Sequence, residues 1–341
     1  MRYFININCI MSRHHLIYTL GLLIFITFSC KDEPKESTPT PATIAKPLVI
    51  PEFSRDSAYA FIAQQVAFGS RVPGTKTHVQ TKDWLVSKLK EYGGQVTVQE
   101  FEVDFLTVKK AKAFNIIATY NPKAKKRISL SAHWDSRMIA EKDANEGMKN
   151  KPIDGADDGG SGVGVLIEIS RLLQTNPPSI GIDIILFDAE DQGFESSSKW
   201  CLGSIYWSKN PHVPNYKALY GIHLDMVGAK NAVFGYEGYS KANASIPMEK
   251  VWNLAATMGY GNYFQKLNKA PIEDDHFHMM ANRSYPVFDI INLSGDSEKI
   301  FGAHHHTHGD NMDIIDKQTL HAVGKVVTAA IYKEDHGSFN N

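Results

Sequence analysis

Acidic residues and histidines gather in five short segments of this chain, and most of these segments follow an apolar run. The segments are HWDSR (133–137), GADDGGSG (155–162), FDAEDQG (187–193), HLDMVG (223–228) and HHHTHGDN (304–311). Short apolar runs are typical of buried strands, and open α/β sheets build their sites where neighbouring strands end. Carboxylate and imidazole ligands without thiolates are typical of hydrolytic zinc sites. The pattern therefore predicts a zinc site at one edge of a sheet.

The sharpest pair is Glu190-Asp191, which follows the apolar run 182–187. Adjacent carboxylates can divide two tasks, because one can bind a metal ion while the other carries a proton. Burial and the like charge of the neighbour raise the pKa of one of them, as a general base requires. Asp158 precedes a glycine-rich helix start and is expected to be a ligand, with Asp157 as a helix cap or a support. The alternative for Glu190-Asp191 is an acidic strand-to-loop junction. The alternative for Asp157-Asp158 is a simple N-cap with an acidic first turn, which does not exclude metal binding.

Two strand ends offer further candidates. His133 and Asp135 follow the run 127–132 at alternate positions, so both side chains are expected to face one cavity unless they form an exposed loop pair. Asp225 ends another apolar run, where a lone aspartate is structural unless other site residues lie beside it.

Two charged runs late in the chain are harder to interpret. Glu273-Asp274-Asp275-His276 is either a functional cluster or a solvated charge run, and His276 and His278 have strand-like spacing. The histidine-rich segment 304–308 is internal, and at most two of its histidines can bind one zinc ion, with the others in support or in solvent.

Alternating helical and strand-like patterns predict a single α/β domain. Helices are predicted at 54–68, 77–92, 160–173, 247–258 and 317–332, and strands at 96–105, 111–120, 127–132, 180–187, 218–224 and 287–293. A long polar loop is predicted at 134–153. Strands that alternate with helices imply a mixed, mainly parallel central β-sheet flanked by helices.

The N-terminal part indicates export. Residues 1–30 are typical of a targeting segment, and Thr27-Phe28-Ser29-Cys30 resembles a lipoprotein processing box, which would anchor the mature protein at Cys30. The alternative is a plain secretory signal or a retained anchor. Residues 31–51 are rich in Pro, Thr, Ser and Lys and are predicted to be a flexible linker, followed by a catalytic domain at 52–341. We therefore expect a lipoprotein in the periplasm or on the outer-membrane surface of a bacterium.

The bulk composition excludes several classes of partner. The net charge is −1, so the chain has no basic field for nucleic acid, and membrane contact is expected only through the anchor at Cys30. The three cysteines are Cys9, Cys30 and Cys201. After processing at Cys30 only Cys201 would stay as a free thiol, so no internal disulfide is expected.

Together the motifs resemble those of the M28-type zinc aminopeptidases and of their relatives, the glutaminyl-peptide cyclotransferases. The resemblance covers about Ser54 to Tyr332 and includes the turn Gly69-Ser70-Arg71-Val72-Pro73-Gly74. It implies the zinc aminopeptidase-like fold, a single α/β domain with a mixed sheet between helices.

The resemblance also assigns roles to individual residues. It implies that Asp158, Asp191 and His306 bind one zinc ion, with Asp191 one methylene shorter than the usual glutamate, and that Glu190 moves protons. Asp274 matches the cyclotransferase aspartate beside the substrate amide. Asp225 matches an aspartate that binds a second metal ion in aminopeptidases and supports a hydrogen-bond network in cyclotransferases.

Three features favour the cyclotransferase branch. They are the runs EDDH (273–276) and HWDSR (133–137), and FDAED (187–191) with the later WCLGS (200–204). This branch would convert the N-terminal glutamine of peptides and proteins to pyroglutamate with release of ammonia, as a monomer with one zinc ion. The substrate pocket is expected to include Trp134, Trp200 and His305, although cyclotransferases usually carry a tryptophan where His305 stands.

Two alternatives stay open. A dinuclear aminopeptidase would hold a second zinc ion with His133, Asp158 and Asp225, all of which are present. His133 is therefore the residue on which the metal count depends, as a second-metal ligand or as a supporting residue. A binding protein without enzymatic activity is the third possibility, and the retained Glu190 and ligand set argue against it.

Overall fold

Six strands form the central sheet, in the order β1-β2-β4-β3-β5-β8. The structure is a computed structural model that describes residues 47–339 except 195–198, 284 and 296–299, so the targeting segment with Cys30 and most of the linker lie outside the described residues. The strands of the sheet are β1 (Gln95–Phe105), β2 (Val108–Tyr120), β3 (Arg127–His133), β4 (Gly181–Phe187), β5 (Gly221–Asp225) and β8 (Val287–Ile291). Two short strands, β6 (Phe234–Tyr236) and β7 (Phe264–Asn268), pair separately.

The sheet is mixed and mainly parallel. β3 pairs in parallel with both β4 and β5, and β5 pairs in parallel with β8. β1 pairs antiparallel with β2, and β2 with β4. The predicted fold class is therefore confirmed, and the carboxyl ends of four strands, β4, β3, β5 and β8, lie at one edge of the sheet.

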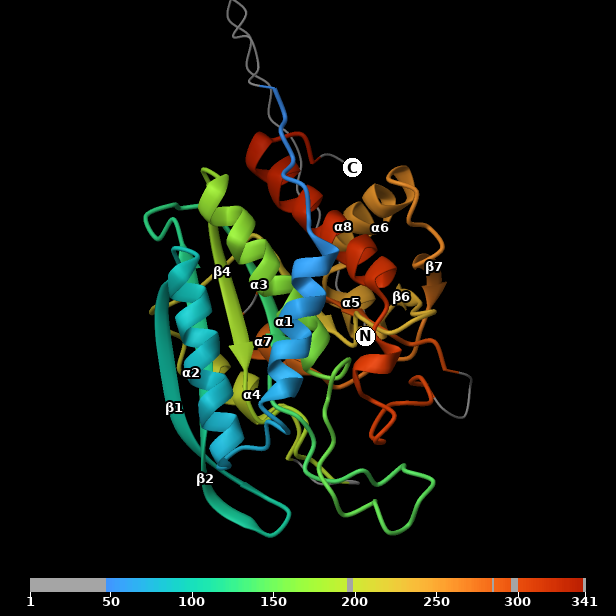
Figure 1. Ribbon diagram of the computed structural model, residues 1–341. Helices are drawn as coiled ribbons and strands as arrows, with labels where there is room; N and C mark the ends of the chain where they lie inside the picture. The colour runs from blue at the N-terminus through green and yellow to red at the C-terminus, as the bar shows by residue number, and fades with distance from the viewer. Residues whose placement is uncertain (1–46, 195–198, 284, 296–299, 340–341) are drawn as a thin grey trace, which may run out of the picture. The chain divides into compact units, whose positions relative to one another are not determined.

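Helices cover both faces of the sheet (Figure 1). The helices are α1 (Arg55–Ala67), α2 (Lys76–Glu91), α3 (Gly160–Thr175), α4 (Leu202–Lys209), α5 (Gly238–Asn243), α6 (Ser245–Thr257), α7 (Asp275–Arg283) and α8 (Lys317–His336). Neighbouring residues of β2 face opposite sides: Ile116 packs with α1, α3 and α8, whereas Ile117 packs with Trp207 of α4 and Met279 of α7. The alternation of strand side chains thus makes two apolar cores.

The ends of two helices that pack on the sheet, α1 and α8, have local causes in the sequence. The side chain of Asp316 accepts from the N–H groups of Gln318 and Thr319 and so caps the start of α8. Gly337, with a φ of 74°, ends this helix in the left-handed conformation that glycine adopts at little cost. Ser54 caps α1 by accepting from the N–H of Ser57.

All five predicted helices and all six predicted strands are confirmed, with ends shifted by a few residues. The polar loop at 134–153 is confirmed too, because no helix or strand forms there. The sequence patterns miss α4, α5, α7, β6 and β7. α7 is missed because its buried face carries Asp275 and His276, so the helix lacks the apolar periodicity on which the other predictions depend.

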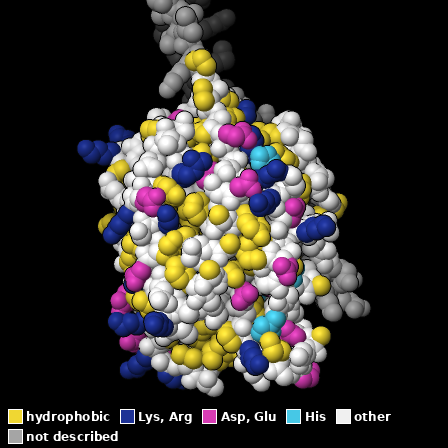
Figure 2. Space-filling model, viewed as in Figure 1, with side chains coloured by type: hydrophobic (Ala, Val, Ile, Leu, Met, Phe, Trp, Pro, Cys, Tyr) yellow, Lys and Arg dark blue, Asp and Glu magenta, His cyan; other side chains and the backbone are white. Residues whose placement is uncertain are grey.

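The face of the molecule that Figure 2 shows carries side chains of both charges. Figure 2 shows lysine and arginine side chains interspersed with acidic and hydrophobic ones over this face. Within residues 47–339, apart from the gaps named above, none of the helices is both long enough and apolar enough to cross a membrane.

Candidate active site

The candidate residues meet at the carboxyl ends of the parallel strands. His133 is the last residue of β3, Asp225 is the last residue of β5, and Glu190 follows the end of β4. Parallel strands end at the same edge of a sheet, so segments far apart in the sequence come together there. A cavity of about 720 Å³ opens at this edge, and its walls include the predicted residues Asp158, Glu190, Asp191, Asp225, Asp274 and His306.

His133 lies among three carboxylates. Its Nε2 atom is 3.0 Å from Oδ1 of Asp158 and 3.3 Å from Oδ1 of Asp225. Its Nδ1 atom is 3.4 Å from Oδ1 of Asp135. Burial favours the neutral imidazole, but the three acids outweigh it and raise the pKa of His133 well above its usual value. His133, Asp158 and Asp225 therefore form one group of donor atoms that could hold a cation.

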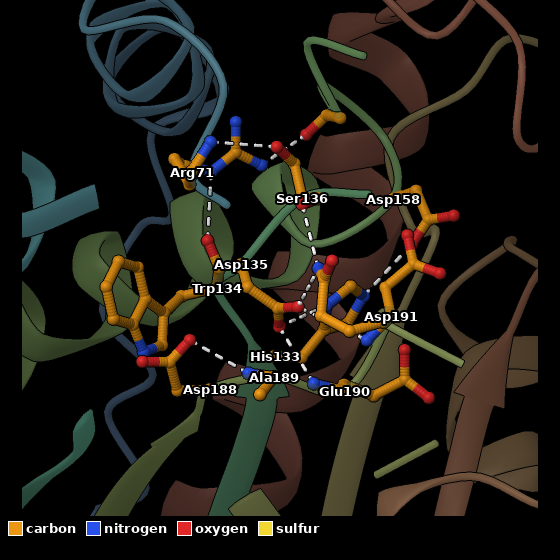
Figure 3. Close-up of polar contacts among 12 residues, drawn as sticks. Arg71, His133, Trp134, Asp135, Ser136, Asp158, Asp188, Ala189, Glu190 and Asp191 are labelled. Carbon is orange, nitrogen blue, oxygen red and sulfur yellow. Dashed lines mark hydrogen bonds and ion pairs between the residues drawn. The ribbon is translucent and has the colours of Figure 1, made fainter. Parts of the chain in front are cut away.

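Asp135 anchors the loop that carries the acidic pair (Figure 3). Its carboxylate accepts from the backbone N–H of Glu190 at 3.1 Å, from that of Asp191 at 3.2 Å, and from the side-chain amide of Gln192 at 2.8 Å. The sequence singles out Asp135 only as a companion of His133. Its anchoring role depends on main-chain donors, which no side-chain motif reveals.

A second group of donor atoms surrounds His306. Its Nε2 atom is 3.1 Å from Oδ1 of Asp191 and 3.9 Å from Oδ2 of Asp158. Its Nδ1 atom lies 2.6 Å from Oε1 of Glu141, which fixes the orientation of the ring as the outer partner of a metal-binding histidine does. Glu141 is missed by the sequence analysis because it lies in a polar loop 165 residues from His306.

The donor set fits a zinc ion. Oδ2 of Asp191 is buried and has no hydrogen-bond partner among the described residues. Buried carboxylate oxygens are costly to leave without a partner, and a cation would supply one. The predicted ligands Asp158, Asp191 and His306 combine oxygen and nitrogen donors, as catalytic zinc sites do.

Asp310 positions the predicted ligand Asp158. Its carboxylate accepts from the backbone N–H of Asp157 at 2.7 Å and from that of Asp158 at 3.1 Å. The carboxylate of Asp157 itself faces Nε2 of His304 at 2.9 Å. The N-cap of α3 is Gly159, so the expectation that Asp157 caps this helix is wrong, and the contacts of Asp157 are those of a support.

Glu190 and Asp274 lie close together on the wall of the cavity. Together with Cys201 they place one polar atom each within 4.8 Å of one another. Burial raises the pKa of Glu190 well above its usual value, and the charges of Asp274 and Asp191 raise it further. A raised pKa within a cavity suits a group that takes up a proton and returns it.

Two histidines lie close to the carboxylate of Asp274. Its Oδ2 atom is 3.3 Å from Nε2 of His223 and 3.8 Å from Nδ1 of His276. Burial opposes ionisation, but both histidines outweigh it and hold the pKa of Asp274 well below its usual value. The strand-like spacing of His276 and His278 is misleading, because both lie on α7 and residues two apart on a helix face different sides. His276 is buried, whereas His278 pairs with Glu273 at 3.1 Å.

Two of the three expected pocket residues line the cavity. Trp200 stacks on His306 with ring centres 5.9 Å apart, and His305 stacks on Phe301 at 4.2 Å. The expectation for Trp134 is wrong. Its side chain is fully buried away from the cavity, stacks on His78 at 4.5 Å and donates to the carbonyl oxygen of Phe114.

Backbone strain occurs around the cavity as well as elsewhere. Nine described residues other than glycine have a positive φ, and four of them lie here: Ala189 (55°), Cys201 (53°), Met226 (48°) and His306 (59°). Each lies beside or within the groups described above. Such conformations are costly and persist where the surrounding structure enforces them, often at functional sites.

Several solved structures share this fold over most of this chain. The glutaminyl cyclase of Tannerella forsythia is 48% identical, with a TM-score of 0.81, over 83% of this chain and 99% of that one. A Zn-dependent exopeptidase from Parabacteroides distasonis is 47% identical, with a TM-score of 0.82 and the same coverage. The glutaminyl-peptide cyclotransferase of Gloydius blomhoffii is 26% identical over 62% of this chain, and the match spans 63% of the length of that relative.

A family model places the chain among these proteins. The model of peptidase family M28 matches residues 115–331, which carry β3, β4, β5 and β8 and every predicted site residue. The match thus covers both groups of candidate metal-binding donors and the carboxylates of Glu190 and Asp274. On the match over more than half of its length, the chain belongs to peptidase family M28.

Proposed function

We propose that this protein is a zinc-dependent glutaminyl-peptide cyclotransferase, which converts the N-terminal glutamine of peptides and proteins to pyroglutamate and releases ammonia. The glutaminyl cyclase of Tannerella forsythia, which this chain matches over 99% of its length, supports the proposal. The observation that carries it is Asp274, a buried carboxylate within 4.8 Å of Glu190 on the cavity wall. A second carboxylate there can hold a substrate amide in place while the first moves protons.

The predicted ligands would hold one zinc ion. Asp158, Asp191 and His306 supply the donors, and Glu141 orients the imidazole. When bound, zinc would supply Lewis-acid chemistry, which makes the carbon of a side-chain amide more susceptible to attack.

Glu190 would move the protons of the reaction. Its carboxylate takes a proton from the α-amine of the substrate as the amine nitrogen attacks the side-chain amide carbon. The same carboxyl group then returns the proton to the amide nitrogen, and the carbon–nitrogen bond breaks to release ammonia. The attack is intramolecular, so the protein gains most by aligning the amine and the amide.

Asp274 and Asp225 would support this step. Asp274 is held ionised by His223 and His276 and can accept a hydrogen bond from the substrate amide. Asp225 faces the cavity, where burial raises its pKa to about 7. Trp200 and His305 would pack against the aliphatic part of the glutamine side chain.

A single incubation tests the proposal. The zinc-loaded protein is mixed with a glutamine-initiated peptide, and peptide mass and free ammonia are followed together. Cyclisation removes the mass of one ammonia from the peptide and releases ammonia in equal amount. Loss of a whole amino acid, or no change in mass, would reject the proposal.

The second candidate is a dinuclear aminopeptidase, and the geometry of His133 favours it. Its Nε2 atom is 3.0 Å from Asp158 and 3.3 Å from Asp225, so the three donors of a second zinc site already lie together. Two zinc ions per chain after dialysis, with release of amino acids from unblocked peptides, would select this function.

We also propose that the protein is exported and anchored to a bacterial envelope through lipidation at Cys30, and that its catalytic part acts as a monomer. The processing box at 27–30 supports the anchor. Labelling with radioactive palmitate in cells should mark the wild type and not Cys30→Ala. Sedimentation of the chain without its targeting segment should give the mass of one copy.

A further inference from the structure

The thiol of Cys201 contacts the residue proposed to carry protons. Its Sγ atom is 3.2 Å from Oε1 of Glu190, and its backbone N–H donates to the carbonyl oxygen of Glu190 at 2.9 Å. Cys201 is fully buried and directly precedes α4. One residue therefore contacts both the main chain and the carboxylate of Glu190.

The thiol is the donor in this contact. Burial raises the pKa of Cys201 well above its usual value, and the charge of Glu190 raises it further, so the sulfur keeps its proton. A protonated thiol is a weak donor, and a carboxylate is a strong acceptor. The hydrogen bond thus runs from Sγ to Oε1 and leaves Oε2 to meet a substrate.

Asp274 is the third member of the group that Glu190 and Cys201 form. Its Oδ2 atom is buried and lies 3.3 Å from Nε2 of His223, and its carboxylate belongs to the same group of three within 4.8 Å. Two carboxylates and one thiol therefore lie close together, and both carboxylates line the cavity. Because one oxygen of Glu190 is anchored, the carboxylate cannot rotate freely and its other oxygen keeps one position relative to Asp274.

We propose that Cys201 is a positioning residue, whose thiol holds Oε1 of Glu190 so that the other oxygen reaches the α-amine of the substrate. The inference rests on the proposed function for the identity of the amine. The thiol forms no covalent bond with the substrate and transfers no proton in the reaction. It acts only through the geometry of the carboxylate, since a loosely placed general base loses rate.

Kinetics of three variants of the zinc-loaded full chain test the proposal. Cys201→Ala removes the donor and should lower kcat about tenfold, with KM changed less than about twofold, as the loss of one aligned hydrogen bond in the transition state implies. Cys201→Ser keeps a donor and should restore kcat to within about threefold of the wild type. Ser170→Ala removes a buried hydroxyl of α3 that bonds Tyr120, and it controls for loss of packing.

Three kinetic results would overturn the proposal. They are an unchanged kcat in Cys201→Ala, a serine variant as slow as the alanine variant, and a rate loss that Ser170→Ala shares. Zinc content and the melting temperature are measured for every variant, and a loss of zinc in Cys201→Ala would show that its effect is structural.

A spectroscopic measurement tests the hydrogen bond between Cys201 and Glu190 and does not depend on enzymatic activity. The infrared difference spectrum of wild type minus Cys201→Ser isolates the S–H stretching band of Cys201. If the thiol is bonded to Glu190, the variant Glu190→Ala should move this band to the frequency of an unbonded thiol. A band that does not move would overturn the inference. If the wild type fails to cyclise glutamine peptides, the proposed function falls, while this spectrum still decides whether Cys201 holds Glu190.

Discussion

Glu190 and Asp191 are adjacent in the sequence, yet their surroundings give them different tasks. Asp191 lies 3.1 Å from His306 and within reach of a cation, whereas Glu190 lies beside Asp274 and Cys201. The backbone N–H groups of both residues bond to Asp135, which fixes the loop between them. Two neighbouring carboxylates can therefore face two different partners.

The variant Glu190→Gln tests this division. Its amide keeps the size of the side chain but cannot take a proton from the substrate. We expect turnover to fall roughly 100- to 10,000-fold, the usual contribution of general acid–base catalysis. Zinc content, measured by atomic absorption, should equal that of the wild type. Full turnover in the variant would contradict the role of Glu190, and a loss of zinc would make it a ligand.

The variant Asp135→Asn tests the anchor. The amide can accept fewer hydrogen bonds than the carboxylate, so the N–H groups of Glu190 and Asp191 lose part of their support. Losses of roughly 10- to 100-fold in zinc affinity or in kcat are typical when such an outer partner is changed. Competition with a chelator measures the affinity, and an unchanged value together with an unchanged kcat would show that Asp135 is dispensable.

Side-chain types predict more of the site than of its support. Asp158, Glu190, Asp191 and His306 are recognisable because they belong to clusters of acids and histidines, most of which follow apolar runs, where α/β sheets build their sites. The roles of Glu141 and Asp310 are not recognisable, because their partners are distant in the sequence or are main-chain groups. Trp134 is predicted wrongly because a tryptophan suits a pocket wall and an apolar core equally well.

At the scale of the elements, the start of α3 packs tightly against the sheet beside the site. A Cβ atom at Gly162 would be 2.5 Å from the carbonyl oxygen of Leu224 and 2.9 Å from Cβ of Ala132. Leu224 precedes Asp225 in β5, so any shift that relieves this clash also moves a site residue. The glycine-rich start of α3 therefore serves close packing as well as the turn before it.

Gly162→Ala should destabilise the protein by about 1 to 3 kcal/mol, the usual cost of overpacking in a core. Gly261→Ala is the matched control, because the nearest atom to its Cβ would be 4.0 Å away. Thermal unfolding followed by circular dichroism compares the two variants with the wild type. Equal melting temperatures for both variants would contradict the tight packing of α3.

The contact between α7 and the start of α5 should make stability depend on pH. Nε2 of His276 lies 2.9 Å from Oε2 of Glu237. Burial opposes both charges, but Asp274 and Glu237 together raise the pKa of His276 from 6.5 to about 9, and His276 lowers that of Glu237 from 4.5 to about 2. The stabilisation is therefore complete between about pH 4.5 and 6.5. It is lost as the pH rises through about 9, where His276 loses its proton, and as it falls through about 2, where Glu237 gains one.

The free energy of unfolding should fall by up to about 3 kcal/mol between pH 6.5 and 9.5 on account of His276. In Glu237→Gln the fall should be clearly smaller, because the imidazolium loses its nearest anion while the amide oxygen can still cap α5. Urea titrations at four pH values measure both curves. Parallel curves would show that the pair does not contribute.

The elements themselves were predictable to the extent that their buried faces are apolar. α3 and β4 are buried along most of their length and carry mostly apolar residues, so their apolar runs are plain. α7 buries Asp275 and His276, and only the tertiary structure supplies the partners that make this burial possible. α7, which begins at the residue after Asp274, is therefore not predicted from the spacing of apolar residues.

At the scale of the whole molecule, the fold brings segments between residues 133 and 306 to one edge of a sheet. β3, β4 and β5 are parallel and β3 lies between the other two, so their carboxyl ends deliver His133, Glu190 and Asp225 to one place. His306, the predicted histidine ligand, then comes from the loop before α8. Family M28 membership and the shared fold agree with this arrangement, whereas the choice between cyclisation and peptide cleavage depends on the metal count and on Asp274.

The most direct measurement of that choice is mass spectrometry of one peptide with two proteins. The zinc-loaded wild type and Glu190→Gln are each incubated with the same glutamine-initiated peptide. We predict that the wild type removes the mass of one ammonia from the intact peptide, and that the variant leaves the peptide unchanged over the same time. Release of free glutamine by the wild type, with the remaining peptide shortened by one residue, would contradict the proposed cyclotransferase activity.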